Sequence, residues 1–158
     1  MDKKDIQILE ELQKDASLSL SEVSERVALS KPACWRRIGA LEAQGVIKAR
    51  VTIVNPKKVN LGVAVYASVR TDHHSQDWFA KFSKAVQEVP EVLEFHRLSG
   101  DKDYLLRIVA PDIDGYSAIY NKLIGSVEMS DFNSSFVMQT LKHTTALPLG
   151  YIARTGAN

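Results

Sequence analysis

A cationic helix predicted between residues 30 and 47 carries residue types that can read DNA. A step of 100° per residue along Ser30-Lys-Pro-Ala-Cys-Trp-Arg-Arg-Ile-Gly-Ala-Leu-Glu-Ala-Gln-Gly-Val-Ile47 places Cys34, Ile38 and Leu41 on one apolar face. Arg36 falls on the opposite face. The major groove of DNA admits one helix, and the planar fork of an arginine pairs bidentately with guanine. The pattern therefore predicts a DNA-reading helix, with Arg36 as its base-contacting residue.

Other polar and small residues near this helix extend the predicted DNA-binding surface. Cations beside Arg36 and after the helix are placed to meet phosphates, which position a protein on the duplex. Hydroxyls near helix starts can also hold phosphate, because backbone N–H groups are unpaired there. The predicted DNA-binding set is Ser19, Ser21, Ser30, Lys31, Pro32, Ala33, Trp35, Arg36, Arg37, Lys48 and Arg50.

Two members of this set have structural alternatives. Arg37 can form an ion pair with Glu42, or with an acid of the preceding helix, instead of contacting a phosphate. Trp35 can pack on the DNA backbone or on the preceding helix, and we expect it to be partly buried.

The charge of the 158-residue chain is uneven, although its net charge is only +1. Residues 1–60 carry 11 Lys and Arg against 8 Asp and Glu, whereas residues 61–158 carry 9 against 11. Between residues 26 and 58 there are eight basic residues and a single acid, Glu42. This block favours a phosphate-facing surface, with a solvated basic face as the alternative.

Three helices must position these residues. The first is expected from about Asp2 to Lys14, and the second begins at Ser19, with Glu22 three residues on in a capping-box pattern. The third runs to Ala43 or Gln44 and is closed by Gly45. This order predicts a helix-turn-helix domain over residues 1–54, winged-helix-like because residues 46–54 resemble a strand. Residues 55–61 are the expected linker.

The second half of the chain has a different rhythm. Alternating apolar residues predict strands over residues 62–70, 92–98, 104–110 and 132–141, with helices over residues 75–89 and from residue 112. The order β-α-β-β-α-β predicts a ferredoxin-like domain over residues 62–145. Residues 146–158 are the expected tail, loose from Ala153. The predicted fold class is α+β.

The composition of the chain limits which cellular compartment and which kinds of chemistry we expect. There is no membrane-spanning apolar run or leader, and the single cysteine, Cys34, cannot form an internal disulfide. A cytoplasmic protein is expected, with Cys34 in the core. We find no nucleophile–base pair, metal-ligand cluster or phosphate-binding loop, so no enzyme, metal or cofactor is predicted. The pair Asp101 and Asp103 is a weak acid–base alternative.

The chain resembles the Lrp/AsnC family, the bacterial and archaeal feast/famine regulators. The resemblance rests on residues 5–9, 18–23, 27–30, 41–42, 45–47, 55–56 and 99–106, together with Cys34 and Arg37. It implies a transcription factor that forms homodimers and assembles to octamers. It also implies that the C-terminal domain, called RAM in this family, binds amino acids. Residues 71–78 and 143–148 resemble a subgroup that responds to cysteine and controls cysteine breakdown.

A short loop offers a site for such an effector. The backbone N–H groups of Ser99-Gly100-Asp101 can surround an α-carboxylate, and Asp103 can accept from the α-amino group. The resemblance implies that further residues of the predicted site occupy positions of the family's effector-response region. It also implies that the pocket lies between dimers. The alternative is an ordinary hairpin whose aspartates satisfy turn amides. The predicted effector-binding set is Arg97, Leu98, Ser99, Gly100, Asp101, Asp103, Tyr104, Ile113, Ser134, Ser135 and Phe136.

The sequence thus favours a DNA-binding regulator controlled by an amino acid. Three alternatives stay open at this point. One is an architectural DNA-binding protein without an effector. Another is an oligomerisation module fused to a DNA reader. The third is an enzyme, since a ferredoxin-like domain can host one.

Overall fold

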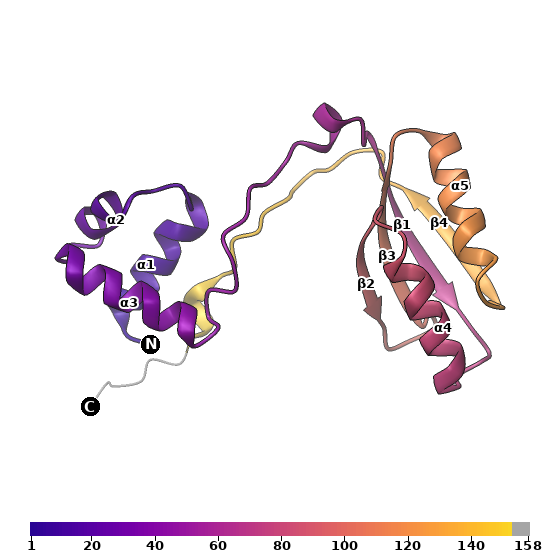
Figure 1. Cartoon of the computed structure of the whole chain (residues 1–158), viewed down its shortest axis with the longest axis horizontal. Helices are drawn as coiled ribbons and strands as arrows, with labels where there is room; N and C mark the ends of the chain where they lie inside the picture. The colour runs from indigo at the N-terminus through magenta and orange to yellow at the C-terminus, as the bar shows by residue number, and fades with distance from the viewer. Residues whose placement is uncertain (153–158) are drawn as a thin grey trace. The chain divides into compact units, whose positions relative to one another are not determined.

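The computed structural model describes residues 1–152 of the chain, which divide into two compact units. The helical unit comprises Met1–Thr52 and, at the C-terminal side, residues 142–152, and the sheet unit comprises Ile53–Leu141. Within residues 1–152, the former contains three α-helices and the latter a sheet with two α-helices. Figure 1 labels these elements along the chain. Each unit has its own hydrophobic core.

The helical unit is built from α1 (Lys3–Lys14), α2 (Leu20–Arg26) and α3 (Lys31–Ala43). Each helix starts at a side-chain cap: Asp2, Ser19 and Ser30 accept hydrogen bonds from backbone N–H groups of the first turn. The predicted capping box is present, with Ser19 and Glu22 bonded reciprocally. The apolar stripes of the helices meet in one core formed by Ile8, Leu9, Val23, Val27, Cys34, Ile38 and Leu41.

The turn between α2 and α3 is tight and holds Ala28 at a positive φ of 52°. The Leu29 N–H donates to the Ser24 carbonyl at 2.9 Å across this turn. A left-handed conformation is costly for any residue with a Cβ, so the geometry of the helix-turn-helix is maintained at some cost in backbone strain.

The C-terminal segment of the described chain returns to α1. The side-chain amide of Gln13 accepts from the Leu147 N–H at 2.7 Å and donates to the Leu147 carbonyl at 3.2 Å. Leu149, in the short 3-10 helix η2 (Leu149–Tyr151), packs against the helical core. The sequence had placed residues 142–145 in the second domain and 146–158 in a tail; residues 142–152 instead group with the helical unit.

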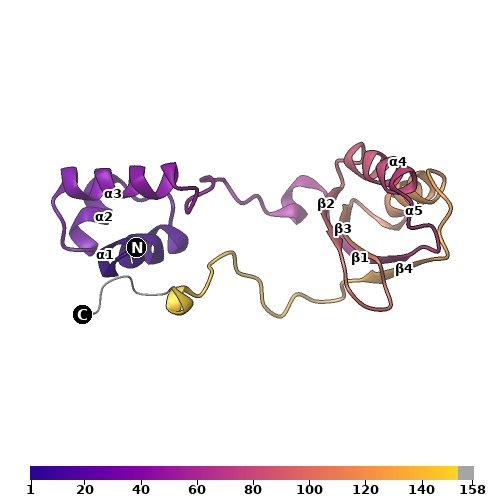
Figure 2. The ribbon, with the colours of Figure 1, turned by 90° about the horizontal axis from the view of Figure 1, so that it is seen from below.

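The sheet unit begins with a 3-10 turn, η1 (Pro56–Val59), and continues as β1 (Val63–Arg70), α4 (Gln76–Gln87), β2 (Val92–Arg97), β3 (Tyr104–Ala110), α5 (Ile113–Ile124) and β4 (Asp131–Phe136). Every strand pair is antiparallel, and the strand order is β2-β3-β1-β4. Figure 2 shows α4 and α5 together on one face of this sheet. The α+β class and the β-α-β-β-α-β order predicted from the sequence are confirmed.

Two strand predictions are wrong. Residues 46–54 form no strand, because the helical unit, as described to residue 152, has no strand to pair with them; Val51 and Ile53 are exposed instead. The last strand ends at Phe136 rather than Leu141, because β1, its hydrogen-bonding partner, begins at Val63. The loose tail predicted from Ala153 lies outside the described residues.

Candidate functional site

The outer face of α3 presents the predicted base-reading residue to solvent. Cys34, Ile38 and Leu41 are buried beneath the helix, as the 100° pattern predicts. Burial raises the pKa of the Cys34 thiol, so this cysteine is an unreactive core residue. Arg36 lies on the exposed side, together with Pro32 in the first turn.

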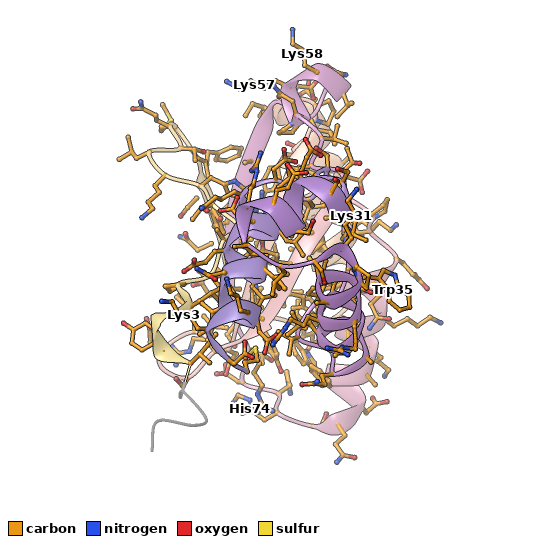
Figure 3. All side chains as sticks on the ribbon, turned by 90° about the vertical axis from the view of Figure 1, so that its left-hand side faces the viewer. Lys3, Lys31, Trp35, Lys57, Lys58 and His74 are labelled. Carbon is orange, nitrogen blue, oxygen red and sulfur yellow. The ribbon has the colours of Figure 1, made fainter. Side chains whose placement is uncertain are left out.

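Trp35 is more exposed than expected. Its side chain is 69% exposed, so the prediction of partial burial is wrong. The core positions of α3 are occupied by Cys34, Ile38 and Leu41, and Trp35 lies outside that stripe. Figure 3 shows Trp35 projecting from α3 at the surface of the helical unit. An exposed tryptophan combines a large apolar ring with an N–H donor, a combination suited to a binding surface.

Arg37 belongs to the fold of the helical unit. One guanidinium nitrogen lies 2.7 Å from a carboxylate oxygen of Asp2 and 2.7 Å from one of Asp5. Hydrogen bonds to Asp5 and Asp2 raise the pKa of Arg37 above its ordinary value. The sequence offered a phosphate contact, or an ion pair with Glu42 or an α2 acid; the partner is instead the start of α1. Asp2 and Asp5 are therefore positioning residues that the sequence interpretation missed.

The three predicted serines are also engaged within the unit. The Ser19 hydroxyl caps α2 and donates to a Glu22 carboxylate oxygen at 2.7 Å. Ser30 caps α3 by accepting from the Ala33 N–H, and Ser21 donates to Glu25 at 3.3 Å. The Ser19 N–H also donates a hydrogen bond to the Glu22 carboxylate, so a negative charge already lies at the start of α2.

The remaining predicted cations differ in how free they are. Arg50 pairs with Glu42 at 3.0 Å, and both side chains are more than 40% exposed, so the pair is weak. Lys31, Arg36 and Lys48 join no ion pair within the described residues. These free cations can meet phosphates or base edges without first losing a partner.

The predicted effector loop is the hairpin turn between β2 and β3. Its ends are joined by the Leu98 N–H donating to the Asp103 carbonyl at 2.8 Å. Gly100 has a φ of 129°, a conformation that side chains with a Cβ rarely adopt, so glycine is required there by the backbone. Ser99, Gly100 and Asp101 are exposed. The loop can thus present backbone N–H groups to an anion.

Asp103 is partly used by the hairpin itself. One carboxylate oxygen accepts from the Thr71 N–H at 2.9 Å, and the other lies 3.9 Å from His74 Nδ1. Its side chain is 27% exposed. Asp103 therefore satisfies a backbone amide, as the ordinary-hairpin alternative expects, and also presents a charged edge toward solvent.

Of the other predicted effector residues, Phe136 and Ile113 lie at the opposite end of the sheet, whereas Ser134 and Ser135 pair with Ala67 and Tyr66 in the middle of β1. Phe136 pairs with Val65, whereas the hairpin begins beside Val69, so Phe136 is at least about 13 Å from the hairpin along β1. Ile113, exposed at the start of α5, lies beyond the strand at the same end as Phe136. One copy of the chain therefore does not bring the predicted effector residues together.

The residues of β4 in the predicted set also face different sides. Ser134 and Phe136 face α5, where the Ser134 hydroxyl is hydrogen-bonded to the Tyr116 hydroxyl and the Phe136 ring contacts the Tyr116 ring edge-on. Ser135 pairs with Tyr66 and points to the face without helices. Neighbouring residues of a strand point to opposite faces of the sheet, so Ser135 cannot line the same pocket as Ser134 and Phe136 within one copy.

Tyr104, a member of the predicted effector set, is a core residue of the sheet unit. It is 5% exposed and packs among the rings of Trp78, Phe79, Phe82 and Phe95. Arg97, its neighbour across the β2–β3 ladder, is exposed. The ring of Tyr104 therefore supports the hairpin from below.

A broad, open depression of about 980 Å³ lies beside the hairpin end of the sheet unit, between the β1–α4 and α5–β4 loops. It is lined by Asp72, Tyr120, Glu128 and Asp131 among others, and by none of the predicted effector residues. Residues 1–152 contain no group of three or more His, Cys, Asp or Glu side chains placed to hold a metal ion. In the same range, no helix has the length and apolar character needed to cross a bilayer.

Comparison with known proteins assigns each unit. Residues 1–48 match the winged helix-turn-helix DNA-binding family, and residues 64–147 match the Lrp/AsnC ligand binding domain. A glutamate uptake regulatory protein of Zymomonas mobilis is 49% identical, covering 94% of this chain and 91% of its own. An AsnC family transcriptional regulator from Agrobacterium tumefaciens superposes with a TM-score of 0.92 at 48% identity, covering 97% and 100%.

A third relative was crystallised with an amino acid. The Neisseria meningitidis transcriptional regulator NMB0573, solved as its L-Met complex, has a TM-score of 0.91 at 38% identity and covers 96% of this chain and 98% of its own. The likeness extends over the helical unit and the sheet unit together. Because both units match in order and two relatives are about half identical over nearly the whole chain, the chain belongs to the Lrp/AsnC family of DNA-binding transcriptional regulators, with a C-terminal ligand-binding domain.

Proposed function

We propose that this protein is a transcriptional regulator whose DNA binding or assembly responds to a small amino acid bound where copies of the chain meet. The observation that carries this proposal is the separation of the predicted effector residues. The hairpin at Ser99–Asp103 and the cluster around Ile113 and Phe136 lie at opposite ends of one sheet. A pocket containing both groups requires a second copy.

The chemistry of the hairpin suits an amino acid. Backbone N–H groups of the exposed residues Gly100 and Asp101 can bind an α-carboxylate, and the Asp103 oxygen that faces His74 can accept from an α-ammonium group. Leu98, Ile113 and Phe136 are exposed apolar side chains that can contact the effector's side chain. The two halves thus divide the work between polar and apolar recognition.

The open sheet face is the contact that we propose for the homodimer. This face carries Tyr66 beside Arg107, with Arg107 bonded to Glu94 at 2.8 Å. A sheet face that no helix of its unit covers is a surface available to a second copy. On the basis of the family resemblance, we also propose that the dimers assemble to octamers and that the protein is cytoplasmic. Analytical ultracentrifugation of Tyr66→Glu tests the dimer, since a charge buried at this position would favour monomers.

Relatives narrow the effector class. One is named for the regulation of glutamate uptake, and another was crystallised with L-methionine. The stretches at 71–78 and 143–148 add cysteine as a third candidate through their resemblance to the cysteine-responsive subgroup. A small amino acid is therefore the proposed effector, and the proposal includes no enzymatic step.

A thermal-shift screen of the purified full chain with each of the 20 amino acids tests the proposal. A ligand present at 100 times its Kd stabilises the folded state by about 2.7 kcal/mol, which raises the unfolding midpoint clearly. No shift with any amino acid, together with DNA binding indifferent to all of them, would instead favour an architectural DNA-binding protein.

Two variants of Asp103 separate its roles. Asp103→Asn keeps an oxygen that can accept from the Thr71 N–H but removes the charge, so we expect normal stability and weaker effector binding. Asp103→Ala loses both, so we expect lower stability as well. Effector affinity unchanged in Asp103→Asn would exclude the proposed contact with the α-ammonium group.

A further inference from the structure

A small depression lies between the start of α2 and one flank of α3. It has a volume of about 300 Å³ and includes Leu18 and Leu20 from the α2 side. Trp35 and Gly39 contribute from α3, one helical turn apart, and Arg50 completes the rim. The depression thus adjoins the exposed face of the DNA-reading helix.

Gly39 is unexplained by the packing of the helical unit. It lies in the interior of α3, is exposed, and has an ordinary helical φ. A Cβ built at this position would meet no atom within 4 Å. Glycine in a helix interior is less stable than alanine, because it has more conformational freedom to lose. The chain therefore keeps a destabilising residue at a place where an alanine would fit.

We propose that this depression, which we call the backbone seat (Leu18, Leu20, Trp35, Gly39 and Arg50), receives one sugar–phosphate unit of double-stranded DNA. The missing side chain of Gly39 allows the DNA backbone to approach α3 closely. Leu18, Leu20 and the ring of Trp35 offer apolar surface to a deoxyribose, and the Trp35 N–H can donate to a phosphate oxygen. Continuity with α3 and the cation at the rim favour DNA as the occupant.

Arg50 supplies the charge that a phosphate requires. Its present partner, Glu42, also lines the depression, and their 3.0 Å ion pair is exposed. Exchanging a weak surface pair for a phosphate costs little, so Arg50 can turn to the DNA when it binds. Glu42 then competes with the phosphate for Arg50, and its removal should strengthen DNA binding.

Substitution of Gly39 tests the seat in the full-length protein. Gly39→Ala should raise the thermal midpoint by a few degrees, because the helix gains stability and nothing clashes. Gly39→Leu should fill the seat and weaken binding to a mixed-sequence DNA duplex by about fivefold per bound copy at 0.15 M salt. The slope of log K against log salt should become shallower by about 0.9 per copy, as expected for one lost phosphate contact.

The controls separate the seat from general effects on folding. Ala118→Leu adds the same side chain to an exposed position of α5 in the sheet unit and should leave DNA affinity and slope unchanged. Glu42→Gln should act in the opposite direction to Gly39→Leu and raise DNA affinity. A Gly39→Leu protein that binds duplex DNA as tightly as the wild type, with the same salt slope, would overturn the proposal. A loss that varies with the DNA sequence at an unchanged slope would overturn it too, since it would indicate a base contact.

Discussion

Replacing Arg37 by glutamine should destabilise the helical unit and leave the number of phosphate contacts nearly unchanged. Arg37 joins α3 to the first turn of α1 through two 2.7 Å contacts, to Asp2 and Asp5. Its side chain is 30% exposed, and that of Asp5 is 16% exposed. An exposed ion pair contributes about 0.2–1 kcal/mol. The shielded Asp5 contact favours the upper end of that range, whereas the Asp2 side chain is 50% exposed and its contact contributes less. We therefore expect a loss of about 1–2 kcal/mol in the free energy of unfolding.

The matched variant is Arg36→Gln, which removes the same charge from the neighbouring residue. Arg36 has no ion-pair partner within the described residues, so its loss should leave stability unchanged and reduce DNA affinity. Thermal unfolding and the salt dependence of DNA binding should be measured for both. A shift of several degrees is expected for Arg37→Gln, since 1 kcal/mol moves the midpoint of a small domain by about 4–8 °C.

The pH dependence gives an independent check. Hydrogen bonds from the Asp5 backbone and from Arg37 hold the pKa of Asp2 below its usual value of 3.8. A carboxyl with a lowered folded-state pKa stabilises the fold above its unfolded pKa, and that contribution is lost as pH falls through the folded value. The stability difference between wild type and Arg37→Gln should therefore be present at pH 6 and shrink below about pH 4. Equal midpoints at neutral pH, with a shallower salt slope for Arg37→Gln, would refute this assignment and make Arg37 a phosphate contact.

Three further predictions follow from single positions. Ala28→Gly should stabilise the protein by about 0.5–1 kcal/mol in urea unfolding, because glycine removes the strain at φ 52°; destabilisation would show that the turn relaxes by other means. Arg36→Ala should weaken binding to a duplex selected by the wild type by about 1–3 kcal/mol and relax one base preference; unchanged discrimination among duplex variants would count against it. Gln13→Ala should speed hydrogen exchange of the Leu147 amide, since it removes both bonds between them; unchanged protection would contradict a tether at this point.

The helices were predictable because their signals are local. Caps such as Ser19 with Glu22 lie within one turn, and apolar stripes repeat along a single element. The strand expected over residues 46–54 shows the limit of local signals. Its residues favour extended structure, but a strand also requires a hydrogen-bonding neighbour, and the described part of the helical unit contains none. Val51 and Ile53 are exposed as a result.

For the candidate site residues, the sequence predicted which side of the helix each side chain lies on, but not which residues it contacts. The 100° step correctly placed Arg36 on the exposed side and Cys34 in the core. It could not show that Asp2 and Asp5, more than 30 residues earlier, meet Arg37, because the crossing of α1 and α3 is a tertiary property. Likewise, alternation along β3 shows that Tyr104 points to one of the two faces of the sheet, but it does not show which face. That is decided by the packing of Trp78 and the neighbouring rings on Tyr104.

The hairpin and the Phe136 end of the sheet, which together carry the proposed effector pocket, are linked to regulation through assembly. If the Ser99–Asp103 hairpin of one copy completes its pocket with the Phe136 end of another, ligand binding and association are one coupled equilibrium. Linkage then acts both ways: the effector favours assembly, and assembly raises the apparent affinity for the effector. Two copies related by a two-fold axis form two such pockets together, whereas a head-to-tail contact must close into a ring to fill them all. In either case each chain supplies one copy of each half-site, so saturation requires one effector per chain. The effector affinity measured at protein concentrations too low for association must be weaker than the affinity measured for the assembled protein.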